Sequence, residues 1–189
     1  MKKRLFIGIP IESGKAILLT EPWRNNKSLN RNLLKWTGPE NWHITLFFLG
    51  NTPESAISLL QQLIEESFTG IQSFSAKLSG VGVFPNTHSP KVLWIGLENL
   101  QRLMRAYTQL SDLLLQNGFS FDNKPLKPHL TLARIKSLEN RVSFDSLLYQ
   151  YRQFSFGSIA INCVVLYESI ISPDGPIYKQ LFVRELDRR

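Results

Sequence analysis

A repeated four-residue pattern constrains the fold of this chain more than any other feature. His-Ile-Thr-Leu at 43–46 recurs as His-Leu-Thr-Leu at 129–132. Each copy lies in a run of β-branched and aromatic residues, which is typical of a β-strand. Each copy also belongs to a longer stretch of the chain that contains a segment with the apolar spacing of a helix. The repeat predicts an α+β fold of two lobes, each an antiparallel sheet with helices, related by a pseudo-twofold axis.

The remaining pattern fits this architecture without a linker or a low-complexity segment. We expect one bilobal domain over residues 1–189, with the two lobes sharing a core. Alternation and turn residues predict strands at 4–9, 42–49, 73–84, 91–97, 129–135, 158–170 and 177–186. Helical spacing predicts helices at 55–67 and 100–114, and residues 12–31 could hold another.

The two repeats place chemistry on one face of each strand. Side chains alternate along a strand, so His43 shares a face with Thr45, and His129 shares a face with Thr131. If the pseudo-twofold axis brings the strands together, a cleft between the lobes receives two imidazoles and two hydroxyls. Such a pair suits phosphodiester cleavage, because one imidazole can accept a proton while the other donates one. The hydroxyls can bind phosphate oxygens.

Arg134 is a further candidate, since a guanidinium would stabilise charge that builds on a phosphate. Strict alternation puts it on the face opposite His129, although a twist near Ala133 could turn it to the rim of the cleft. A zinc site would need further ligands with characteristic spacing. The chain has one other histidine, His88 in a polar loop, and one cysteine, Cys163 in an apolar run. We therefore expect no metal and no other cofactor.

Charge and hydropathy limit the partners and the cellular location that we expect for the protein. The net charge of +7, with a pI near 9.7, favours polyanions as partners. No apolar run approaches the roughly 20 residues that span a bilayer, so we expect no membrane association. The basic and apolar start of the chain ends at Pro10, too soon for a signal peptide. We expect a cytoplasmic monomer.

At these residues the sequence resembles a known family, the RNA 2',3'-cyclic phosphodiesterases, or 2'-5' RNA ligase-like proteins, of the two-histidine phosphoesterase superfamily. The resemblance spans nearly the whole chain. It rests on the opening strand at 4–9 (with Gly8 where the family usually has alanine), on Trp36 with 39–50, on 127–134, and on 166–169 with 175–178.

The resemblance implies hydrolysis of a terminal 2',3'-cyclic phosphate on RNA to a 2'-phosphate with a free 3'-hydroxyl, without a metal. It implies that His129 is the proton acceptor that activates water and that His43 is the proton donor to the leaving 3'-oxygen. Thr45, Thr131 and Arg134 would bind the phosphate. The family can also catalyse joining into a 2'-5' linkage.

The substrate surface is less sharply defined. Trp36 and Phe84 are our candidates for stacking on a base, which is worth about 1–3 kcal/mol per base. Two alternatives remain open at this point. One is a phosphodiesterase for small nucleotide cyclic phosphates, and the other is a non-catalytic RNA-binding module. The second is less compatible with a chain that keeps both histidines and both threonines of the repeat.

Overall fold

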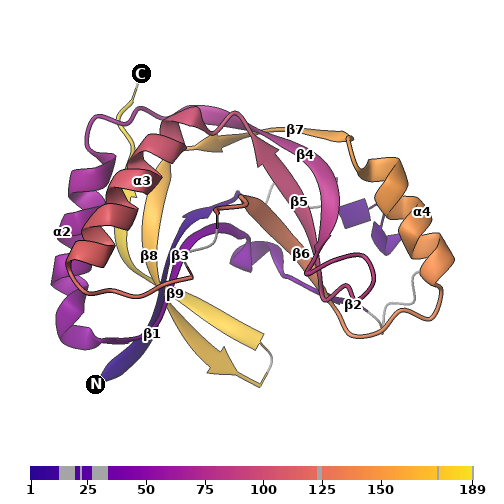
Figure 1. Cartoon of the computed structure of the whole chain (residues 1–189), viewed down its shortest axis with the longest axis horizontal. Helices are drawn as coiled ribbons and strands as arrows, with labels where there is room; N and C mark the ends of the chain where they lie inside the picture. Colours follow the sequence, from indigo (N-terminus) through magenta and orange to yellow (C-terminus); the bar gives the residue numbers. More distant parts are fainter. Residues whose placement is uncertain (13–19, 22, 27–33, 123–124, 174, 189) are drawn as a thin grey trace.

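The strands of the protein belong to one curved antiparallel sheet (Figure 1). The computed structural model describes residues 1–12, 20–21, 23–26, 34–122, 125–173 and 175–188. Within them, nine strands form the sheet, at Lys2–Pro10 (β1), Leu34–Trp36 (β2), His43–Pro53 (β3), Phe74–Phe84 (β4), Val92–Glu98 (β5), His129–Ile135 (β6), Ser155–Ile161 (β7), Cys163–Ser172 (β8) and Gly175–Glu185 (β9). Most of the helix considered at 12–31 lies outside the described residues.

The sheet consists of two halves that meet between β3 and β6. The strand order is β7-β4-β5-β6-β3-β1-β8-β9, with β2 paired to β6. Outward from the junction, each half therefore runs through four strands in a matching arrangement. Between β3 and β6, the ladder that joins the halves contains a single pair of residues, Ile44 and Leu130. The predicted α+β class is confirmed, and the two expected sheets are hydrogen-bonded into one at this narrow junction.

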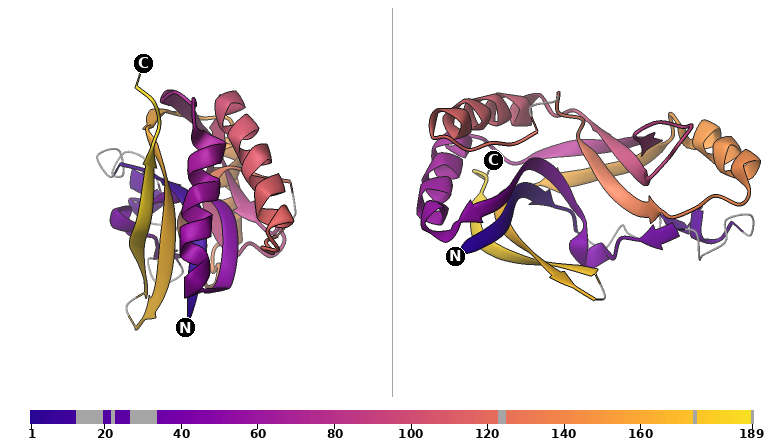
Figure 2. Two further views of the ribbon diagram at one scale, coloured as in Figure 1. Left: turned by 90° about the vertical axis from the view of Figure 1, so that its left-hand side faces the viewer. Right: turned by 60° about the horizontal axis from the view of Figure 1, so that its bottom comes forward.

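Helices cover both ends of the sheet (Figure 2). Ile57–Phe68 (α2) follows a short 3-10 turn at Glu54–Ala56 (η3) and packs against Gln101–Gln116 (α3). Tyr107 of α3 stacks on Phe47 of β3, with ring centroids 4.5 Å apart. These contacts attach α2 and α3 to the first half of the sheet.

The helix Arg141–Tyr151 (α4) covers the other end, against β4. Its N-terminus is capped by Asn140, whose side-chain oxygen accepts a hydrogen bond from the Ser143 N–H at 3.1 Å. The sequence prediction missed α4 because its buried stripe is short, only Phe144, Leu147 and Leu148. Within the described residues, no helix is long and apolar enough to cross a membrane.

One predicted strand is wrong in its extent. The run 158–170 is not one strand, because β7 ends at Ile161 and β8 begins at Cys163, with Asn162 between them. β7 before the break pairs with β4 in the second half, whereas β8 after it pairs with β1 in the first half. Ile161 before Asn162 and Val164 after it are both fully buried. The apolar pattern therefore continues from β7 into β8, and the sequence does not indicate that the two strands lie in different halves.

Candidate active site

The junction of the two halves brings the repeated motifs together. Ile44 and Leu130 pair across it and are fully buried on one side of the sheet. In an antiparallel ladder this register sets His43 opposite Thr131 and Thr45 opposite His129. These four side chains lie on the other side of the sheet and are half-buried. The structure thus places the predicted imidazoles and hydroxyls at one point.

Both imidazoles are held in the same way. Nδ1 of His43 lies 2.7 Å from the carbonyl oxygen of Asn41, and Nδ1 of His129 lies 2.7 Å from that of Lys127. Because a carbonyl oxygen only accepts, each Nδ1 must carry the proton and donate it. The nitrogen left for chemistry is therefore Nε2 in both rings. Nε2 of His43 is 3.1 Å from the Thr45 hydroxyl oxygen.

Aromatic rings fix the orientation of each imidazole. In the first half, His43 packs against Phe6 and Tyr178, with centroid distances of 4.8 and 5.0 Å. In the second half, the ring of Phe84 meets His129 edge-on at 4.9 Å. Packing and a backbone hydrogen bond together leave each imidazole little freedom, which is what a positioned acid or base needs.

Burial lowers the pKa of both histidines from its usual value. Hydrogen bonds from the rings to the carbonyls of Asn41 and Lys127 oppose this effect. The charge of His129 lowers the pKa of His43 further. The two imidazoles are thus close enough to interact electrostatically, and in the free protein the neutral forms are favoured.

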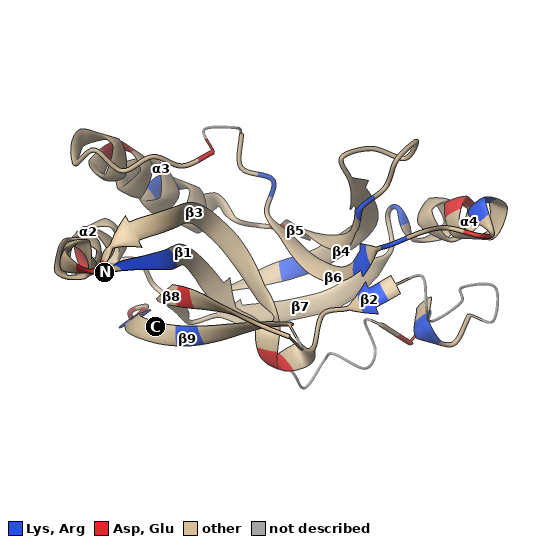
Figure 3. Ribbon diagram, turned by 90° about the horizontal axis from the view of Figure 1, so that it is seen from below, with Lys and Arg blue, Asp and Glu red and all other residues tan. Residues whose placement is uncertain are grey.

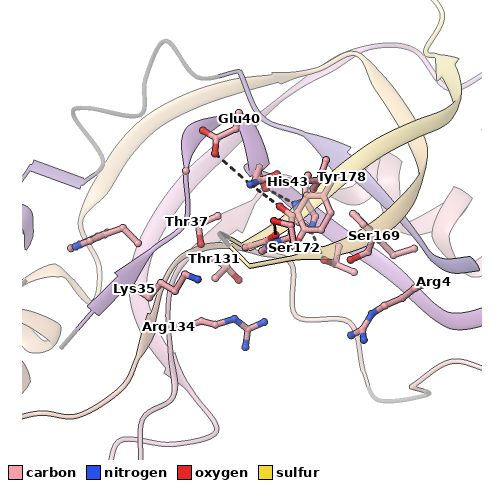
Figure 4. Close-up of a pocket in the computed structure, with 18 of the residues that line it drawn as sticks. Arg4, Lys35, Thr37, Glu40, His43, Thr131, Arg134, Ser169, Ser172 and Tyr178 are labelled. Carbon is pink, nitrogen blue, oxygen red and sulfur yellow. Dashed lines mark hydrogen bonds between the residues drawn. The ribbon is translucent and has the colours of Figure 1, made fainter. Parts of the chain in front are cut away.

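A cavity of about 940 Å³ opens beside the junction (Figure 4). Its walls come from β1, β2, β3, β6, the 3-10 turn Pro39–Asn41 (η2) and the β8–β9 hairpin. Among the predicted site residues, those that border it are His43, Thr45, Thr131, Arg134 and Trp36. The other two predicted site residues, His129 and Phe84, are not among the described residues that border the cavity.

Arg134 reaches the cavity because β6 contains an extra residue. Leu93 of β5 pairs with Ala133, but the next residue, Trp94, pairs with Thr131. Leu132 is therefore a bulge, which shifts the alternation by one position. The bulge puts Arg134 on the same face as His129 and Thr131, contrary to strict alternation.

The first motif carries the same bulge. Gly8 of β1 pairs with Thr45, whereas the preceding Ile7 pairs with Phe47, so one residue of β3 is skipped. Phe48 consequently turns to the cavity face, at the place that Arg134 holds in the second motif. The sequence analysis did not single out Phe48. Writing His-Ile-Thr-Leu-Phe-Phe over His-Leu-Thr-Leu-Ala-Arg would have indicated it.

Cys163 of β8 packs against the small cluster of Phe6, Val165 and Tyr167. Burial, helped by the charge of Glu185, raises the pKa of the Cys163 thiol to about 11, so it stays protonated at neutral pH. Within the described parts of the chain, no three His, Cys, Asp or Glu side chains gather as metal ligands would. The expectation of a metal-independent site stays a prediction.

This fold, with paired imidazoles where two matching half-sheets meet, is accompanied by clear similarity to known proteins. Residues 6–181 match the family described as the AKAP7 2'5' RNA ligase-like domain. The RNA 2',3'-cyclic phosphodiesterase of Thermotoga maritima is 37% identical over 147 residues, 78% of this chain and 76% of the relative. A protein of the same name from Aquifex aeolicus is 39% identical over 76% of this chain and 77% of its own. The chain belongs to the 2'5' RNA ligase-like family.

Solved structures show the same fold. A Thermus thermophilus protein, TT0787, superposes with a TM-score of 0.78 at 27% identity and covers 97% of both chains. E. coli LigT, solved in complex with 3'-AMP, gives a TM-score of 0.78 at 23% identity, covering 98% of this chain and 99% of its own.

Proposed function

We propose that the protein is a hydrolase that opens the 2',3'-cyclic phosphate at the end of an RNA, leaving a 2'-phosphate and a free 3'-hydroxyl. The observation that carries the proposal is the pair of imidazoles at the junction, each with Nδ1 bound to a backbone carbonyl and Nε2 left to react. The curated relatives named RNA 2',3'-cyclic phosphodiesterase support the substrate class.

In the proposed reaction, Nε2 of His129 takes a proton from a water molecule whose oxygen attacks phosphorus. The bond from phosphorus to the 3'-oxygen breaks, and Nε2 of His43 gives its proton to that oxygen. Each such transfer contributes about 10²–10⁴-fold in rate. The same roles, with a 5'-hydroxyl in place of water, would give a 2'-5' linkage.

Thr45, Thr131 and Arg134 are proposed to bind the non-bridging phosphate oxygens, where charge builds in the transition state. Binding an anion here also helps the acid. Burial lowers the pKa of His43 in the free protein, and a bound phosphate would raise it again, so that Nε2 carries a proton when it is needed. Burial also lowers the pKa of His129, which favours the neutral form that a base needs.

The direct test uses an RNA ending in a 2',3'-cyclic phosphate, with phosphorus NMR to separate the cyclic ester from 2'- and 3'-phosphates. We expect conversion to the 2'-phosphate, with an unchanged rate in excess EDTA. A 3'-phosphate product would contradict the assigned leaving group, and loss of turnover in EDTA would contradict the metal-free mechanism. Binding of RNA without turnover would favour the non-catalytic alternative. The cytoplasmic location and the monomeric state stay predictions.

A further inference from the structure

Two arginines converge on the cavity without acidic partners. Arg4 of β1 and Arg134 of β6 both border it, and their guanidinium groups point toward each other from opposite sides in Figure 4. Within the described part of the chain, no carboxylate pairs with either. Glu40, the acidic residue among the described ones that line the cavity, lies 3.4 Å from the amide nitrogen of Asn41.

Like charges held face to face repel, and an anion between or beside them relieves the repulsion. Lys and Arg residues also mark β1, β2 and β6, the strands around the cavity (Figure 3). One guanidinium, Arg134, is next to the junction and serves the reacting phosphate. The second, Arg4, is left over for another anionic group.

Arg4 has an aromatic neighbour of a suitable kind. Its guanidinium carbon lies 4.8 Å from the centre of the Phe48 ring. Phe48 is 44% exposed, although it is a large apolar side chain in a central strand. A guanidinium is planar, so an aromatic ring against its face holds it in place and leaves its N–H groups free for a phosphate. The exposed remainder of the ring offers a surface for a base, which stacks without sequence preference.

Tyr178 lies near both Arg4 and Arg134. Burial raises the pKa of its phenol, while the charges of Arg134 and Arg4 lower it. Its ring also packs edge-on against His43. The same side chain thus borders the proposed acid and lies within electrostatic reach of both guanidiniums, so Arg4 belongs to the cavity of the junction and not to a separate surface.

We propose that Arg4 and Phe48 form a second subsite, which binds the internucleotide phosphate and the base of the nucleotide that precedes the cyclic end. The proposal rests on the proposed function and sharpens its substrate class. The preferred substrate is then an RNA chain of two or more nucleotides, because a nucleoside cyclic phosphate carries one phosphate only and leaves Arg4 without an anion.

The test compares kcat/KM for three substrates: uridine 2',3'-cyclic phosphate, its 5'-phosphorylated form, and the diuridine with a 3'-terminal cyclic phosphate. The wild type should prefer the diuridine over the nucleoside. Arg4→Gln should reduce that preference about fivefold at 0.1 M salt, the effect of losing one contact to a single-stranded phosphate. Arg4→Lys, which keeps the charge, should retain most of it.

Phe48→Ala should also reduce the preference for the diuridine by about fivefold, the low end of the stacking range. It should affect the 5'-phosphorylated nucleotide less, because that substrate has no second base. The chain offers a matched control. Directly after α4, Arg152 lies 3.6 Å over the ring of Tyr149, which is 69% exposed and outside the cavity. Arg152→Gln and Tyr149→Ala should leave the preference as it is.

The outcomes separate the two proposals. If the wild type turns over all three substrates with equal kcat/KM, or if Arg4→Gln lowers all three equally, the second subsite is overturned while the phosphodiesterase stands. If the control variants at Arg152 and Tyr149 reduce the preference as much as Arg4→Gln, the effect is one of net charge and the subsite is again rejected. If the wild type opens none of the cyclic phosphates, the proposed function itself fails.

Discussion

The two histidines present the same nitrogen to the junction because each uses Nδ1 in a hydrogen bond with a carbonyl two residues earlier. This local bond sets the tautomer before any substrate arrives. The difference between the rings lies in their neighbours. His43 is enclosed by Phe6 and Tyr178 on the cavity side, while His129 rests against Phe84 and does not border the cavity.

Replacing either histidine should abolish most of the turnover. We expect His43→Ala and His129→Ala each to lower kcat by about 10²–10⁴-fold, the usual worth of one positioned acid or base. His88→Ala is the matched control, since His88 is exposed in the loop after β4 and should keep wild-type kcat. Turnover within a few-fold of wild type in both junction variants would contradict the acid–base assignment.

The pH dependence should reflect the lowered pKa values. The ratio kcat/KM reports the free enzyme, in which burial lowers the pKa of both His43 and His129 below 6.5. The base must be neutral, so kcat/KM rises with pH through one apparent pKa. The acid must be protonated, so it falls through the other. We therefore expect an optimum of kcat/KM below pH 6.5, with the two apparent pKa values belonging to the pair.

The bound phosphate should move this optimum. Its negative charge raises the pKa of His43 in the complex, so kcat should stay high to a higher pH than kcat/KM. Full pH profiles of both constants on one cyclic phosphate check this. An optimum of kcat/KM on the alkaline side of 7 would mean that these two imidazoles are not the titrating groups.

At the scale of elements, two bulges decide which side chains reach the cavity. Strand alternation was enough to predict that His43 and Thr45 share a face, and that His129 and Thr131 do. It was not enough for Arg134, because the bulge at Leu132 depends on how β6 pairs with β5. That pairing joins segments far apart in the chain, and the sequence carries no local signal for it. The break at Asn162 escaped prediction for a similar reason, since tertiary pairing divides one apolar run between two halves.

Because the junction is narrow, we expect a substitution at Leu130 to affect both stability and turnover. Leu130 is fully buried and pairs with Ile44, the single pair that joins β3 to β6. Leu130→Ala should lower the free energy of unfolding by about 2–5 kcal/mol. It should also reduce kcat of the folded protein, because the cavity it leaves lies directly beneath the two motifs.

Leu60→Ala provides the comparison. Leu60 is equally buried but lies in α2, outside the junction. It should lose a similar amount of stability, measured by denaturant unfolding, yet keep the wild-type kcat at a temperature where both variants are folded. Equal kcat for the two variants would show that the packing beneath the motifs does not position the histidines.

At the scale of the whole molecule, the basic charge and the fold serve the same site. The net charge of +7 raises the local concentration of polyanions around the protein. The two matching halves then supply one imidazole and one threonine each to the place where they meet. The repeat in the sequence was sufficient to predict this plan. Phe48 and Arg134 hold equivalent positions in the two motifs, yet one is aromatic and the other is cationic. This difference makes the cavity asymmetric, as a substrate with distinct ends requires.

A site assembled from two halves of one chain should not depend on association with a second copy. Both motifs come from the same chain. After Met1, the most exposed large apolar side chains among the described residues are divided between α4, with Val142 and Tyr149, and the β8–β9 hairpin, with Ile171 and Ile177. We expect a sedimenting species of 21.7 kDa and a turnover per chain that is constant over roughly a hundredfold range of protein concentration. If turnover per chain instead rises with concentration together with a larger sedimenting species, a second copy contributes to the site, and the one-chain assembly of the junction is incomplete.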